Sequence, residues 1–211
     1  MGFVMMGLTV FMLAPLALVA WYYARHKPAV ARRLQEQTWQ PLADRLGARW
    51  IPSPGGSTHH MFTTTAGATQ VTALVFHRIA VDRAVAHEVG RGDPGGWRTF
   101  VQASVVGGVA PAALITPRYR AGGAPIGDAA FQQAHATRPL HRTPPEAIAA
   151  RLTPSVAHAF AVLGPRYTAL VAGPGFVSLQ LPGVCSDPQL LEAAVHVVGM
   201  FAQPDPRLAA A

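Results

Sequence analysis

Charged residues are scarce in this chain. They make up 13% of its 211 residues, against about 25% in an average soluble protein, and half of the residues are hydrophobic. A free domain normally displays more charge, so the composition predicts that part of the surface is covered by a partner or a membrane.

Acidic residues are rarer than basic ones: 10 Asp and Glu stand against 17 Lys and Arg, a formal net charge of +7. Much of the excess lies in residues 25–33. Further along, the arginines are scattered and form no patch interleaved with aromatic residues, which argues against a nucleic-acid partner.

The single cysteine, Cys185, excludes an intrachain disulfide and a zinc site built on cysteines. It lies between a Pro-Gly turn and a predicted helix, where a thiolate can be stabilised. No histidine adjoins it in sequence, so we expect a small buried thiol. His59 and His60 point to opposite faces of a strand and have no third ligand spaced nearby. We therefore predict no catalytic residue, no cofactor and no metal.

The first 24 residues contain no charged residue and no histidine. A helix of that length spans roughly 36 Å, enough for a hydrocarbon core of about 30 Å. The stretch predicts a transmembrane helix over residues 1–24. Its C-terminal aromatic residues would lie among the lipid headgroups, and its small residues would pack on a neighbouring helix. The first set is Trp21, Tyr22 and Tyr23, and the second is Gly7, Ala14 and Ala17.

The alternative is a cleaved signal peptide. Such a peptide has a basic start, a shorter apolar core and a cleavage site of small residues. Here the start is uncharged, and Trp-Tyr-Tyr occupies the place of the cleavage site. The sequence favours an uncleaved anchor.

Four basic residues follow the apolar stretch, with no acidic residue among or before them: Arg25, Lys27, Arg32 and Arg33. The positive-inside rule then predicts a single-pass protein of the bacterial inner membrane, with its N-terminus outside and residues 25–211 in the cytoplasm. The same side chains suit contact with anionic lipid headgroups. The sequence alone does not decide whether these four residues only set the topology or also bind anionic lipids.

The rest of the chain predicts basic juxtamembrane and interfacial helices over residues 25–47 and one α+β domain over residues 48–211. In that domain a largely antiparallel sheet is packed with helices. A short helix from Pro41 to Leu46 should end at Gly47. Alternating β-rich runs predict the first strands, at 50–51, 60–65, 69–79, 99–106 and 112–116. The polar, Gly- and Pro-rich residues 117–142 predict a loop with one helical turn at 128–134.

The last third of the chain has clear start and stop signals. Thr143-Pro144-Pro145-Glu146 matches a capping box and predicts a helix to about Arg151. Thr153-Pro154 begins another helix, which Gly164 ends. Strands at 167–172 and 176–181 form a hairpin. Ser186-Asp187-Pro188-Gln189 opens a final helix whose apolar stripes predict burial against the sheet.

Short motifs in the chain resemble a loose group of uncharacterised, membrane-anchored bacterial proteins. They run from Trp39-x-x-Leu42-Ala43 to Leu46-Gly47-Ala48-Arg49-Trp50, then Gly127-Asp128-Ala129-Ala130-Phe131, Leu152-Thr153-Pro154, and Asp187-Pro188-x-Leu190-Leu191. An acidic residue often follows the phenylalanine in that group, where this chain has Gln132. The resemblance implies no activity.

These observations predict a non-catalytic accessory or scaffolding subunit of a larger membrane complex, with a respiratory or photosynthetic assembly as a natural host. Its expected partners are the lipid bilayer and other membrane-protein subunits. Two alternatives stay open: a membrane-surface enzyme with a pocket near Cys185, and a lipid-sensing or regulatory domain.

Overall fold

The computed structural model describes residues 18, 21, 37, 39–50, 58–66, 69–77, 97–118, 123–173, 175–205 and 208. The chain divides into two units, residues 1–41 and 42–211. In the first unit, Leu18 and Trp21 are helical and exposed. All described strands and nearly all described helical residues belong to the second unit.

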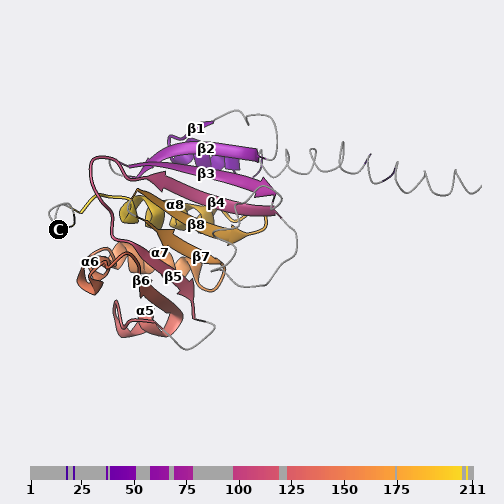
Figure 1. Ribbon diagram of the computed structural model, residues 1–211. Coiled ribbons are helices and arrows are strands. Elements are labelled where there is room, and N and C mark those ends of the chain that lie inside the picture. The colour runs from indigo at the N-terminus through magenta and orange to yellow at the C-terminus, as the bar shows by residue number, and fades with distance from the viewer. Residues whose placement is uncertain are drawn as a thin grey trace, which may run out of the picture. The chain divides into compact units, whose positions relative to one another are not determined.

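The centre of the second unit is an eight-stranded sheet in the order β1-β2-β3-β4-β8-β7-β5-β6, and every paired strand is antiparallel to its neighbour (Figure 1). The hairpin β7–β8 is inserted between β4 and β5. The strands are β1 (Arg49–Trp50), β2 (Thr58–Ala66), β3 (Thr69–His77), β4 (Trp97–Ser104), β5 (Ala113–Pro117), β6 (His135–Pro139), β7 (Ala169–Ala172) and β8 (Phe176–Pro182).

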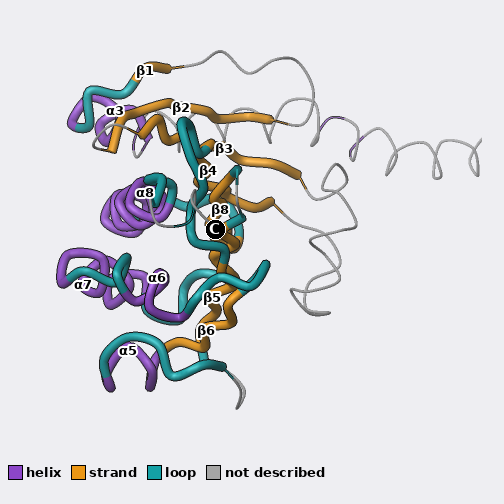
Figure 2. Tube along the Cα trace, turned by 60° about the vertical axis from the view of Figure 1, so that its left-hand side comes forward, coloured by secondary structure: helices purple, strands orange, loops and turns teal. Residues whose placement is uncertain are grey.

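The described helices lie together on one face of this sheet (Figure 2). They are α3 (Gln40–Arg45), α5 (Ala129–Ala134), α6 (Pro145–Ala149), α7 (Pro154–Leu163) and α8 (Pro188–Phe201). An ion pair between Arg45 and Glu192 joins the end of α3 to α8. We call this side the helix-covered face and the opposite side, which no described helix covers, the open face.

The core lies between α8 and the middle of the sheet. Asp187 caps α8 by accepting hydrogen bonds from the backbone N–H groups of Gln189 and Leu190 at 2.9 and 3.2 Å, and Pro188 occupies the first turn. Both apolar stripes of the helix are buried, as predicted. They meet strand side chains that are also fully buried, among them Val71, Ala73, Val75, Val101, Val177, Leu179 and Leu181. Burying one of the Val or Leu side chains stabilises the fold by about 1.5–3 kcal/mol.

The α+β fold and the largely antiparallel sheet are as predicted, but two local expectations are wrong. Residues 135–139, expected as loop, form β6, which pairs with β5 along its whole length. Thr143 does not cap α6: Pro144 is the N-cap residue and makes no side-chain hydrogen bond. The Thr143 hydroxyl instead accepts a hydrogen bond from the N–H of Ala112 at 3.0 Å.

Among the residues that the structure describes, no helix is long and apolar enough to cross a membrane. The longest described helix, α8, has 14 residues, whereas a span needs about 20. This finding corrects our prediction of a transmembrane helix and, with it, of a single-pass, N-out protein of the inner membrane. Within residues 1–24 only Leu18 and Trp21 belong to the described part.

Candidate functional site

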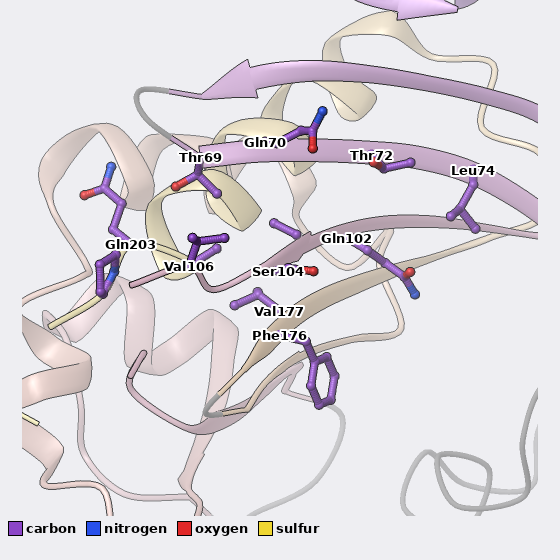
Figure 3. Close-up of a pocket in the computed structure, with 13 residues that line it drawn as sticks. Thr69, Gln70, Thr72, Leu74, Gln102, Ser104, Val106, Phe176, Val177 and Gln203 are labelled. Carbon is purple, nitrogen blue, oxygen red and sulfur yellow. The ribbon is translucent and has the colours of Figure 1, made fainter. Parts of the chain in front are cut away.

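A groove of about 720 Å³ lies at the end of three neighbouring strands. It runs from the open face of β3, β4 and β8 to the C-terminal end of α8 (Figure 3). We call it the strand-end groove. Its polar lining residues are Thr69, Gln70, Thr72, Gln102, Ser104 and Gln203. Its larger apolar lining residues are Leu74, Val106, Phe176, Val177 and Pro204.

The strand register explains how these side chains meet. Val71 pairs with Ala103 and Ala73 with Val101, and all four point to the helix-covered face. Because successive side chains alternate between the faces, the residues between them point to the open face. Thr72 therefore lies opposite Gln102, which in turn lies opposite Ser178. Residues far apart in sequence form one polar row across the sheet.

Some of the polar groups in the strand-end groove are already paired. The hydroxyls of Thr72 and Thr63 lie 3.1 Å apart, and the Gln102 amide donates to the Ser178 hydroxyl at 3.2 Å. Within the described part of the chain, no side-chain hydrogen bond engages the amide of Gln70 or the hydroxyl of Ser104, and both residues are exposed. The groove therefore presents neutral donors and acceptors to solvent.

The apolar side chains of the groove are unusually exposed. Val106 is 80% and Phe176 50% exposed, and no other described residue of 42–211 is a large hydrophobic residue with comparable exposure. They come from adjacent strands: Ser104 pairs with Phe176, and the N–H of Val105 donates to the carbonyl of Gly175 at 3.0 Å. The Phe176 ring lies over Gly173. Large exposed apolar groups that gather at one place mark interaction sites.

The segment after α8 forms one wall of the groove. The N–H of Asp205 donates to the carbonyl of Val109 at 2.8 Å, and this bond holds residues 203–205 beside the loop that follows β4. A Cβ atom on Gly108 would lie 2.7 Å from Cβ of Pro204, so only glycine fits there without a shift. Arg151 supports the wall from behind by donating to the carbonyl of Gln203 at 2.8 Å.

Cys185 lies outside the strand-end groove, between β8 and α8. Its N–H donates to the Thr99 hydroxyl at 2.8 Å, and its thiol to the carbonyl of Asp187 at 3.5 Å. Burial raises the pKa of the thiol to about 11. The thiol is therefore protonated at neutral pH, which does not favour a nucleophile.

A second buried titratable group is His135, at the start of β6. Its Nδ1 lies 3.0 Å from the hydroxyl of Tyr167, and its ring contacts the rings of Phe131 and Phe160 at centroid distances of 4.6 and 5.1 Å. Burial lowers the pKa of His135 to about 4, so the ring is neutral at physiological pH. The contacts are those of a packed core residue joining α5 and α7 to the sheet.

Most site residues proposed from the sequence lie outside the described part of the chain. These are the small and aromatic anchor residues Gly7, Ala14, Ala17, Tyr22 and Tyr23, and the basic residues Arg25, Lys27, Arg32 and Arg33. Trp21 is helical and 57% exposed. No group of three described His, Cys, Asp or Glu residues could hold a metal ion.

Sequence reasoning missed the strand-end groove altogether. Its lining comes from three strands and the end of a helix that are adjacent only in the folded sheet. The one local signal was the presence of polar Gln and Ser at alternate positions of otherwise apolar strands. That pattern indicates a solvent-facing side but does not show which strands are neighbours.

Comparisons with known proteins name no family for the chain. No family model matches it, and no curated protein matches it. Among solved structures it is similar to the crystal structure of the mycobacterial trehalose monomycolate transport factor A, TtfA, with 8% identity and a TM-score of 0.47. The match covers 82% of this chain and 92% of that one. A likeness at this level supports no conclusion about function.

Proposed function

We propose that residues 42–211 form a non-catalytic binding module, an accessory or scaffolding subunit that docks on another protein through the strand-end groove. The observation that carries this proposal is the joint exposure of Val106 and Phe176 at one groove. Burial of either side chain by a partner would make the free energy of binding more favourable by about 25 cal/mol for every Å² of apolar surface removed from water.

The composition of the groove supports a protein partner. Of the thirteen residues that line it, none is charged, and the centres of protein interfaces are likewise depleted of charge and enriched in aromatic residues. A groove of about 720 Å³ also falls within the size range of small-molecule sites. Such sites, however, enclose most of their ligand, whereas Val106 and Phe176 are largely exposed to solvent here.

The test is photo-crosslinking in the cells that make the protein, with p-benzoylphenylalanine placed at position 106. We expect one discrete adduct with another protein, and Phe176→Asp in the same chain should reduce its yield at least about tenfold, because a charge in the apolar contact is costly to desolvate. The matched control places the photoreactive residue at the exposed position 189, at the other end of α8, roughly 20 Å away.

The same adduct from positions 106 and 189 would contradict the proposal, and so would the absence of any adduct from position 106. Circular dichroism of each variant serves as the check on folding. All three changed positions, 106, 176 and 189, are exposed, and replacements at such positions normally change stability by less than about 0.5 kcal/mol.

A further inference from the structure

The chemistry of the strand-end groove limits what its occupant can be. Gln70 carries a side-chain amide with one acceptor oxygen and two donor hydrogens, and Ser104 carries a hydroxyl that both donates and accepts. Gln102 already donates to Ser178, and the described part of the chain places no donor on its oxygen. The groove therefore offers both donors and acceptors, all of them neutral.

These groups match the polypeptide backbone. An extended segment presents unpaired N–H and C=O groups along its length, and a side-chain amide can bond to both kinds. A helix has already paired its backbone groups internally, so it would leave the amide of Gln70 without a backbone partner. Helix-binding grooves are instead mainly hydrophobic.

The absence of charge in the lining limits the occupant further. A charged side chain that enters the groove loses water and meets no counter-charge among the thirteen lining residues. The described charges nearby lie outside this lining. Arg98 is on the open face of β4, beyond Phe100, whereas Arg151 is bonded to the carbonyl of Gln203 and Asp205 is buried. The lining therefore disfavours acidic and basic segments alike.

We infer that the strand-end groove receives an uncharged, extended segment of a partner protein. The backbone of that segment bonds to Gln70, Gln102 and Ser104, and an apolar side chain packs against Val106 and Phe176. This inference rests on the proposed function, because it names the part of the partner that the groove holds. It requires no conformational change of the sheet.

Isothermal titration calorimetry of the full chain with synthetic peptides tests the chemistry directly. The main probe is a short acetylated, amidated peptide of alternating Thr and Val with a central Phe. Two further probes replace the threonines by Asp or by Lys. We expect saturable binding of the neutral peptide with a Kd below about 1 mM, and at least about tenfold weaker binding of both charged peptides.

Two more probes test the backbone contacts. One is the neutral peptide with alternate backbone N–H groups methylated, and the other is a neutral, helix-forming peptide with one Phe. Both should bind at least about fivefold more weakly, because the groove's acceptors are left unpaired. Gln70→Met should weaken binding of the unmethylated peptide severalfold and that of the methylated one by a smaller factor, because methylation leaves only the carbonyl groups to bond with Gln70. Gln133→Met, at an exposed position of α5, is the matched control.

A charge placed in the strand-end groove should make it discriminate between the two charged peptides. With Ser104→Lys, the Asp-containing peptide should bind at least about tenfold more tightly than the Lys-containing one, whereas Gln133→Lys should leave the order of affinities unchanged. Equal binding of neutral and charged peptides by the native chain would overturn the inference, as would tighter binding of the helical peptide or no saturable binding at all. A persistent cross-link from position 106 would in that case leave the proposed function standing.

Discussion

Two consecutive residues of β8 show the difference between the two faces of the sheet. Phe176 is 50% exposed at the strand-end groove, whereas Val177, the next residue, is fully buried beneath α8. The backbone environment of the two is nearly the same. Only the alternation of side chains separates an apolar group that stabilises the fold from one that is left for a partner.

The comparison extends across the sheet. On the helix-covered face, Val71, Ala73 and Val101 are fully buried and meet other apolar groups. On the open face at the same strands, Thr72 and Gln102 occupy the alternate positions and are partly exposed. The side chains beneath the helices therefore stabilise the fold. On the open face Leu74 and Phe100 are also buried, so only its exposed positions, such as Phe176, are free to change without loss of the fold. Substitutions on either face test this contrast.

The largest expected effect comes from the core. Leu179→Ala should lower the free energy of unfolding by about 3 kcal/mol, because it removes a fully buried side chain and leaves a cavity under α8. Phe176→Ala, on the same strand but the open face, should change it by less than about 0.5 kcal/mol. Urea denaturation followed by circular dichroism measures both. Similar losses for the two variants would show that Phe176 is packed in solution and is no docking residue.

The second prediction concerns pH. The pKa of His135 is lowered from 6.5 to about 4 in the folded chain. The unfolded chain therefore binds more protons between those pH values, and the free energy of unfolding should fall by up to about 3 kcal/mol as pH falls through this window.

Binding in the strand-end groove should not change over the same window, because no lining residue titrates. The free energy of unfolding of His135→Phe should vary much less with pH than that of the native chain. If both chains lose the same stability between pH 6.5 and 4, another group is responsible.

The third prediction concerns Asp187 at the N-terminal end of α8, the end away from the groove. Asp187→Ala removes the acceptor of two backbone N–H groups and the partner of Arg166, whose guanidinium lies 2.9 Å from the carboxylate. We expect a loss of about 1 kcal/mol in the free energy of unfolding. Affinity for the neutral peptide should be unchanged, because the groove lies at the opposite end of the helix. A large loss of affinity would mean that α8 transmits changes to the groove.

The last prediction concerns the wall of the strand-end groove. Gly108→Ala places a methyl group against Pro204 and must displace residues 203–205 or the facing loop. The free energy of unfolding should change by less than about 1 kcal/mol, while affinity for the neutral peptide should fall severalfold. Gly175→Ala is the control, since a Cβ there meets no atom within 4 Å. Equal affinities of the two variants would show that the wall takes no part in binding.

Local signals were sufficient for much of the fold. Asp187 and Pro188 marked the start of α8, and the 3.6-residue spacing of its apolar residues identified its buried side. The β7–β8 hairpin followed from two short apolar runs around Gly173 and Gly175. In each case the interactions that decide the structure join residues close in sequence.

Local signals failed where a distant group competes for a residue. The five residues of β6 include Arg138 and Pro139 and have little strand propensity, yet β5 supplies their hydrogen-bonding partners. Thr143 matches a capping box, but its hydroxyl accepts from Ala112 instead of capping α6. The apolar run of residues 1–24 predicted a membrane span that no described helix provides.

Over most of residues 97–205 the amino-acid sequence by itself determined which segments become strands and helices. It also determined which side of each segment is apolar. Propensity, capping and periodicity act within a few residues, so local sequence is enough for both. Tertiary contacts alone set β8 beside β4, and therefore Phe176 opposite Ser104. Strand order depends on contacts between segments more than 70 residues apart, and no local pattern specifies them. The strand-end groove exists only because of that order.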